Sequence, residues 1–169
     1  MKNKTKVRKE LRRIRLAMSD LEHTRKSRAI VKNLKQAIDW SRIKTVHYFE
    51  PIKGLMEPDT SDFINYIEDE FPHIELYTPR KIEGKWELVS AKGGPVPAKF
   101  DVILVPMLGF DPKSLHRIGY GGGFYDKFLA TQSKALKLGV SFDLGRVNDI
   151  PVESHDIALS QIITETSST

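Results

Sequence analysis

The apolar stretch VILVPML, from Val102 to Leu108, decides the fold of this 169-residue sequence. Its first four residues contain no polar side chain, so both faces of the strand that they predict are apolar. A strand of this kind is typical of the centre of a parallel sheet that helices cover on both sides. The stretch is far too short to cross a bilayer, and we therefore expect it to be a buried central strand.

Apolar segments alternate with helical patterns on both sides of this strand. Further strands are predicted at 45–49, 74–77, 86–89, 138–142 and 157–163, the last at an edge, and helices at 1–18, 20–38, from 60 or 61 onward, and at 124–133. This alternation predicts an α/β fold: one three-layer α/β/α domain over residues 1–169, with a mostly parallel central sheet. Ligands of such sheets bind beyond the carboxyl ends of the strands, where the loops 50–60 and 106–123 should meet.

The composition is that of an ordinary globular protein, with 40% hydrophobic and 29% charged residues. Cysteine is absent, which excludes disulfides, a thiol nucleophile and zinc–thiolate sites. The histidines lack metal-ligand spacing, and there is no serine-nucleophile motif. Without an apolar signal segment at the start, we expect a cytoplasmic protein, monomeric and not attached to a membrane.

The positive charge is concentrated in residues 1–15, which carry eight Lys or Arg and one acid, so this segment is +7 and the rest of the chain −2. Val7, Leu11, Ile14 and Met18 form one apolar stripe at helical spacing. Such a helix can bind nucleic acid, act as a transit peptide, or bring cations to an anionic small molecule. The stripe and the absence of aromatic residues favour docking on the core without nucleic acid, and a nucleic-acid-binding module is the alternative.

The stretch RIGYGGGFYDKFL, from Arg117 to Leu129, places four glycines within five residues. Glycine has no Cβ, so backbone N–H groups can approach a polyphosphate closely, and the helix that follows offers free N–H donors. Arg117 adds a guanidinium that suits phosphate. A ligand-free glycine turn explains the pattern equally well. Asp126 either complements the helix dipole or ligates Mg²⁺ beside phosphates, and Asp156 is a candidate second ligand.

Four ordered motifs resemble the 5-formyltetrahydrofolate cyclo-ligase family, also known as 5,10-methenyltetrahydrofolate synthetases. The longest is DVILVPMLGFD followed by RIGYGGGFYDKFL, which is similar to the family's strand ending in VP, then GFD, then R-[LI]-G-x-G-x-G-[FY]-Y-D. The others are K-x-x-V-R at Lys4–Arg8 followed by AMS at 17–19, EPDT at Glu57–Thr60, and P-x-x-x-x-D with IITE between Pro151 and Glu165. They span nearly the whole chain.

This resemblance implies an ATP- and Mg²⁺-dependent conversion of 5-formyltetrahydrofolate to 5,10-methenyltetrahydrofolate. ATP would activate the formyl oxygen, N10 would attack the activated carbon, and ring closure would expel phosphate. Positioning and charge neutralisation would dominate such chemistry.

The resemblance also assigns residues by their match to the family's motifs. Catalytic roles fall to Tyr125 and Arg117, and magnesium binding to Asp126 and Asp156. Folate contacts fall to Phe49, Glu57 and Tyr125. Nucleotide binding falls to Lys4, Arg8, Arg117, Gly119, Gly121, Gly122, Gly123, Phe124 and Tyr125, with Tyr120 as a neighbour at a position where the family varies.

Two departures from the family pattern leave a second interpretation open. The usual F-D-x-x-G-x-R is one residue longer here, from Phe110 to Arg117, and lacks its glycine, so the turn before Arg117 must be rebuilt. The loop EPIKGLMEPDT is also long before Glu57. An ATP-binding relative of the same fold with a non-folate substrate is therefore the alternative enzyme.

Overall fold

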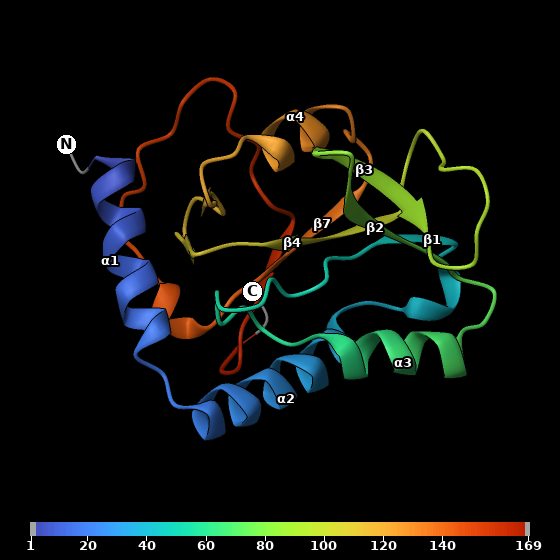
Figure 1. Cartoon of the computed structure of the whole chain (residues 1–169), viewed down its shortest axis with the longest axis horizontal. Helices are drawn as coiled ribbons and strands as arrows, with labels where there is room; N and C mark the ends of the chain where they lie inside the picture. Colours follow the sequence, from blue (N-terminus) through green and yellow to red (C-terminus); the bar gives the residue numbers. More distant parts are fainter. Residues whose placement is uncertain (1–2, 168–169) are drawn as a thin grey trace.

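The computed structural model describes residues 3–167, so Lys2 of the basic segment lies outside the described residues. Helices and strands alternate along most of this range (Figure 1). In chain order they are α1 (Lys4–Leu16), α2 (Asp20–Ala37), the 3-10 helix η1 (Trp40–Arg42), β1 (Thr45–His47), α3 (Ser61–Glu70), β2 (Glu75–Ile82), β3 (Lys85–Ser90), β4 (Val102–Pro106), β5 (Gly109–Phe110), β6 (Arg117–Ile118), α4 (Phe124–Ala130), β7 (Leu136–Val140), the 3-10 helix η2 (Asp143–Gly145) and β8 (Gln161–Ile163).

The main sheet has six strands in the order β3-β2-β1-β4-β7-β8. All its neighbouring strands pair in parallel except β2 and β3, which form an antiparallel hairpin at one edge. The first five residues of the apolar stretch VILVPML form β4, between β1 and β7, which confirms the predicted mostly parallel sheet with this strand at its centre. A separate two-stranded ribbon, β5–β6, was not predicted.

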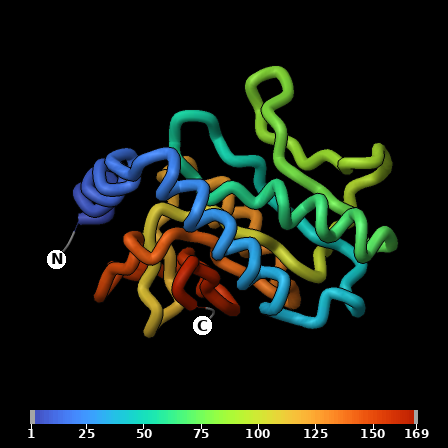
Figure 2. The backbone as a smooth tube through the Cα atoms, turned by 90° about the horizontal axis from the view of Figure 1, so that it is seen from below, coloured from blue at the N-terminus to red at the C-terminus, as the bar shows by residue number. Residues whose placement is uncertain are grey.

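The side chains of β4 alternate between two apolar clusters, one on each face of the sheet. Val102 and Leu104 pack with α2 and α3, whereas Ile103 and Val105 pack with α4. Helices α2 and α3 lie side by side on one face and α4 lies on the other (Figures 1 and 2). A strand that is apolar on both faces therefore indicated correctly that helices cover both sides.

Several predicted boundaries were wrong by a few residues, and one strand was mostly wrong. Of the strand expected at 157–163, only Gln161–Ile163 joins the sheet. The backbone N–H of Leu159 donates instead to the carbonyl of Leu115, and that of Ser160 to the carbonyl of Lys137. Of residues 157–160, only Ser160 donates its backbone N–H to β7, and the segment before it is a loop. Helix α4 also ends earlier than predicted, at Ala130.

The basic helix α1 docks on the protein through its apolar stripe. Leu11 is buried with Leu108, Ile118 and Ile150, and partly buried Val7 packs against this cluster. This packing agrees with the docked interpretation of the segment. Within residues 3–167, none of the helices combines the length and apolar character needed to cross a bilayer.

His47 of β1 is fully buried under α4, where its ring contacts the aromatic rings of Phe100, Tyr125 and Phe128. Neither ring nitrogen has a hydrogen-bond partner in the part of the chain that the structure describes. Burial lowers the pKa of His47 from 6.5 to about 3. The backbone groups of His47 and Leu104 act in the opposite direction, with a smaller effect on the pKa. The imidazole is therefore neutral at physiological pH.

This buried imidazole should make stability fall in acid. In the unfolded chain His47 takes up a proton near its ordinary pKa of 6.5, but in the folded protein only near 3. The free energy of unfolding should therefore decrease as the pH falls through this window, by up to about 1.4 kcal/mol per pH unit for one proton. We predict that His47→Leu shows a shallower decrease in urea unfolding between pH 7 and 4, whereas the control His73→Gln, at an exposed position, behaves like wild type. Parallel curves for His47→Leu and wild type would contradict this account.

Candidate active site

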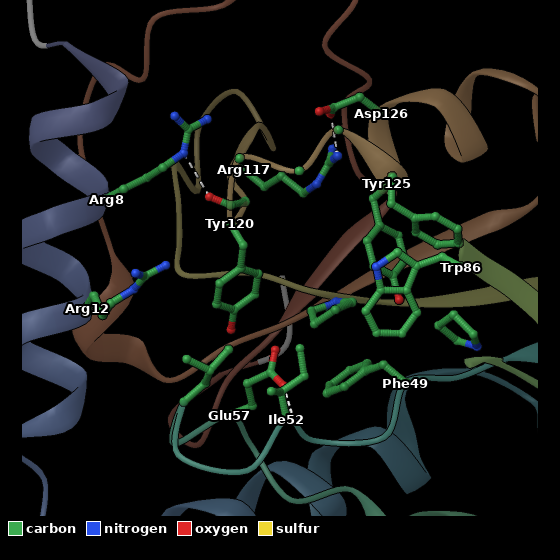
Figure 3. Close-up of a pocket in the computed structure, with 18 of the residues that line it drawn as sticks. Arg8, Arg12, Phe49, Ile52, Glu57, Trp86, Arg117, Tyr120, Tyr125 and Asp126 are labelled. Carbon is green, nitrogen blue, oxygen red and sulfur yellow. Dashed lines mark hydrogen bonds and ion pairs between the residues drawn. The ribbon is translucent and has the colours of Figure 1, made fainter. Parts of the chain in front are cut away.

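A cavity of about 270 Å³ lies at the carboxyl ends of the parallel strands, enclosed by α1, the loop after β1, the β2–β3 hairpin and the glycine-rich loop (Figure 3). The loops 50–60 and 106–123 do meet there, as expected from an α/β sheet. The lining residues are Lys4, Arg8, Arg12, Phe49, Glu50, Ile52, Leu55, Glu57, Pro79, Trp86, Pro106, Arg117, Gly119, Tyr120, Gly121, Gly122, Gly123, Phe124, Tyr125, Asp126 and Asp156.

The glycine-rich loop exposes its backbone on one side of this cavity. Gly121 and Gly123 have φ of 96° and 72°, a left-handed conformation that other residues adopt only at a cost. A Cβ built on Gly119, Gly122 or Gly123 would meet no atom within 4 Å, so their backbones are uncovered. The sequence therefore places bare backbone where an anionic group can approach closely.

Helix α1 presents a row of cations to the same space. Lys4, Arg8 and Arg12 are spaced four residues apart, so they share one helix face, and all three line the cavity. The Nε of Arg8 donates to the carbonyl oxygen of Gly119 at 3.0 Å and ties the helix to the glycine loop. Within residues 3–167, no carboxylate pairs with Arg8 or Arg12. Arg12 was not predicted, although its spacing from Lys4 and Arg8 was a usable signal.

The two acids assigned to magnesium each form an ion pair with a predicted phosphate ligand. An Nη of Arg117 lies 2.5 Å from Oδ1 of Asp126, and Nζ of Lys4 lies 2.6 Å from Oδ2 of Asp156. Burial alone would raise the pKa of Asp156, but the hydrogen bond from Lys4 and that from the Glu153 backbone lower it. Opposite charges are thus paired within the cavity wall.

Arg117 reaches the cavity despite the longer turn before it. Leu115, two residues earlier, adopts φ of 57°, the left-handed conformation that a glycine would take without strain. The N–H of Leu115 donates to the carbonyl of Asp111, and the N–H of Asp111 donates to the carbonyl of His116, which closes the turn. The Arg117 side chain is 5% exposed and is directed at Asp126. The rebuilt turn keeps Arg117 in the site.

The opposite wall is aromatic and holds one buried carboxylate. Phe49, Trp86 and Tyr125 gather on this side (Figure 3), and half-exposed Trp86 contacts the Phe124 ring. Trp86 was missed because it reaches the cavity only through the β2–β3 hairpin, whose position no local sequence signal gives.

Tyr125 contributes a buried hydroxyl that has no hydrogen-bond partner within residues 3–167. Burial, together with the charge of Glu57, raises the pKa of Tyr125 well above its ordinary value, while Arg117 acts in the opposite direction. The phenol therefore keeps its proton and can donate a hydrogen bond to a ligand.

Glu57 is 2% exposed although it carries a carboxylate. Its Oε2 accepts the backbone N–H of Ile52 at 2.6 Å, and its own carbonyl oxygen lies 2.6 Å from Nε2 of His23. Met56, directly before it, has φ of 49°, so the backbone is bent at this point. The loop is thereby folded so that the Glu57 carboxylate, a hydrogen-bond acceptor, lines the cavity.

The structure brings every residue that the sequence assigned to the site into the lining of this one cavity. Their individual roles stay predictions. One wall of the cavity carries cations and exposed backbone, and the facing wall carries aromatic rings and a carboxylate. This arrangement suits a ligand that combines an anionic group with a flat polar ring. Together with the three-layer α/β fold, this places the protein in the class of small-molecule enzymes.

Comparison with known proteins identifies the family. Residues 1–165 match the sequence pattern of the 5-formyltetrahydrofolate cyclo-ligase family, and the chain belongs to that family. The 5-formyltetrahydrofolate cyclo-ligase of Mycoplasma genitalium is 30% identical over 150 residues, which cover 85% of this chain and 87% of that protein. The enzyme of the same name from Haemophilus influenzae is 25% identical over 178 residues, covering 93% and 95%.

Solved structures agree with this assignment. A 5,10-methenyltetrahydrofolate synthetase from Aquifex aeolicus matches with a TM-score of 0.81 and 26% identity, over 98% of this chain and 91% of that chain. One from Mycoplasma pneumoniae shares the fold with a TM-score of 0.83 at 23% identity, over 97% and 99%. The protein is therefore an enzyme, a ligase of the cyclo-ligase family that belongs to folate metabolism.

Proposed function

We propose that the protein converts 5-formyltetrahydrofolate to 5,10-methenyltetrahydrofolate with consumption of ATP in the presence of Mg²⁺. The observation that carries this proposal is the division of one cavity into a cationic glycine-loop wall and an aromatic wall with a buried carboxylate. The first suits the triphosphate of ATP, and the second suits the ring system of the folate.

The triphosphate would lie between α1 and the glycine-rich loop. Lys4, Arg8 and Arg12 line the cavity from α1, and Arg117 lines it from β6. Arg8 and Arg12 have no carboxylate partner within residues 3–167, so their charges are available to an anion. The uncovered backbone of Gly119 and Gly122 permits close approach of phosphate oxygens.

Magnesium would be held by Asp126 and Asp156. Both carboxylates line the cavity beside the cationic groups, and Mg²⁺ prefers one or two carboxylates combined with phosphate oxygens. The ion would neutralise part of the charge that develops on the phosphates. Arg117 and Lys4, the ion-pair partners of these two acids, supply positive charge at the same places.

The chemistry conserves atoms and electrons in two steps. The formyl oxygen forms a bond to the terminal phosphorus of ATP, the bond to ADP breaks, and an imidate-like phosphate results. N10 then attacks the formyl carbon and loses its proton, and the C–O bond breaks to release phosphate. The side chains supply position and charge: Arg117 and Arg8 at the phosphates, the Tyr125 hydroxyl as donor near the reacting oxygen, and Glu57 at the ring.

A spectrophotometric assay tests the proposal. Purified protein with 5-formyltetrahydrofolate and MgATP should form the methenyl product, and omission of ATP or Mg²⁺ should abolish its formation. If no ATP-dependent product forms over a wide range of enzyme concentrations, a relative with a non-folate substrate becomes the better interpretation.

Asp126→Asn should lower activity at least roughly tenfold and shift the Mg²⁺ concentration needed for half-maximal rate upward, because a metal ligand is lost. Asp143→Asn is a matched control, since Asp143 also pairs with an arginine and is 33% exposed against 34% for Asp126, but lies outside the cavity. The rate as a function of Mg²⁺ concentration is the measurement. An unchanged magnesium dependence in Asp126→Asn would mean that this carboxylate serves only Arg117 and the helix terminus.

Gly121→Ala should raise the KM for ATP several-fold, because the φ of 96° costs a side chain roughly 1–2 kcal/mol and the loop backbone must shift to relieve it, whereas the new Cβ would make only an ordinary contact with the Arg8 guanidinium, at 3.7 Å. Gly93→Ala carries a comparable backbone cost at φ of 72°, in a loop away from the cavity. Thermal unfolding and KM for ATP are measured for both. Equal changes in KM in the two variants would refute a specific role of the glycine loop in nucleotide binding.

A further inference from the structure

Arg15 is a buried cation for which the proposed reaction has no use. Its side chain is fully buried at the end of α1. One terminal nitrogen donates to the carbonyl oxygens of Met107 and Leu108, at 2.5 and 3.3 Å, and the other donates to the hydroxyl of Tyr120 at 2.7 Å. Within residues 3–167 no carboxylate forms an ion pair with it. Burial of a charge without a counter-charge costs several kcal/mol. The presence of a buried guanidinium at this position therefore needs an explanation.

The hydroxyl of Tyr120 has only one way to arrange its hydrogen bonds. A guanidinium can only donate, so the Tyr120 oxygen accepts from Arg15, and its own proton is free for another acceptor. The Tyr120 side chain extends from the glycine loop toward Glu57 (Figure 3). Burial raises the pKa of Tyr120, Arg15 lowers it, and both the charge of Glu57 and a hydrogen bond to it raise it. The phenol therefore stays protonated and donates toward the carboxylate.

Glu57 completes this chain on the cavity side. One of its oxygens is already held by the N–H of Ile52, and the side chain is almost fully buried. The Tyr120 hydroxyl faces this carboxylate (Figure 3), and Arg15, whose Nη lies 2.7 Å from the Tyr120 oxygen, polarises the hydroxyl from the other side. The Tyr120 hydroxyl thus lies on the path from the buried guanidinium of Arg15 to the buried carboxylate of Glu57.

We propose that Arg15 is a positioning residue that acts through the Tyr120 hydroxyl to fix the orientation of the Glu57 carboxylate for the N–H donors of the substrate ring. This inference rests on the proposed function of Glu57 as a folate contact. In this proposal the backbone and the side chain of Tyr120 have different roles. The backbone is part of the glycine-rich loop that binds the nucleotide, and the side chain lies in the half of the cavity that binds the folate.

A purely structural role for the same contacts makes a different prediction. If Arg15 only joins α1 to the carbonyls that follow β4, its loss lowers stability without selecting between the two substrates. If the Tyr120 side chain serves the nucleotide, its loss raises the KM for ATP. The proposed relay instead predicts a selective effect on folate.

The test is Tyr120→Phe, which removes only the hydroxyl. We expect a rise of roughly tenfold in the KM for 5-formyltetrahydrofolate, typical of the loss of one charge-assisted hydrogen bond, with the KM for ATP within about twofold of wild type. Tyr77→Phe is the matched control, because Tyr77 is also buried and its hydroxyl donates to the Glu75 carboxylate at 2.6 Å, away from the cavity. This control should leave both KM values at the wild-type level.

Arg15→Met in the wild-type and Tyr120→Phe backgrounds tests whether Arg15 acts through Tyr120. The substitution should raise the folate KM in the wild type and add little in the Tyr120→Phe background. If Arg15→Met does not fold, as its melting temperature would reveal, Arg15→Lys, which keeps the charge but not the two-nitrogen fork, is compared in the same two backgrounds.

The outcomes separate this inference from the proposed function. An unchanged folate KM in active Tyr120→Phe, or an equal effect of Arg15→Met in both backgrounds, overturns the relay and leaves the cyclo-ligase proposal intact. Absence of methenyl product with the wild-type protein overturns both, because the relay has no substrate to position.

Discussion

The burial of the Arg15 guanidinium is the interaction on which the arrangement of the site depends. It holds the end of α1 against the carbonyl oxygens that follow β4, at the carboxyl edge of the parallel sheet. This contact fixes the helix face that carries Lys4, Arg8 and Arg12 beside the glycine loop. The guanidinium keeps these acceptors only while α1 stays docked, so α1 is an integral part of the domain and the basic charge has a defined position.

The cavity contains two ion pairs whose members can also bind the charged groups of a ligand, together with arginines that have no carboxylate partner within residues 3–167. Asp126 and Asp156 pair with Arg117 and Lys4, so each of these four charges has a partner of opposite sign in the cavity wall. Arg8 and Arg12 remain without carboxylate partners within residues 3–167. The site thus combines a preorganised cationic wall with acids available to a divalent ion, which accords with catalysis by positioning and charge neutralisation.

The sequence predicted the fold and the location of the site better than the details of either. The four apolar residues that open β4 were sufficient for a covered parallel sheet, because a strand buried on both faces has few alternatives. Residues 157–160 looked like a strand, but the backbone N–H of Leu159 donates to the loop residue Leu115, and within this segment only that of Ser160 donates to strand β7, at Lys137, an arrangement that periodicity does not encode. Arg12 could have been found from its helical spacing, whereas Trp86 could not, since only the tertiary position of the hairpin brings it to the cavity.

A structure of the protein with Mg²⁺, a non-hydrolysable ATP analogue and 5-formyltetrahydrofolate tests the central claim most directly. The account predicts phosphate oxygens between the α1 cations and the backbone N–H groups of Gly121 to Gly123, and the folate ring between Phe49 and Tyr125 with its N–H groups on Glu57. Binding of the phosphates away from α1, or of the folate ring without contact to Glu57, would contradict it.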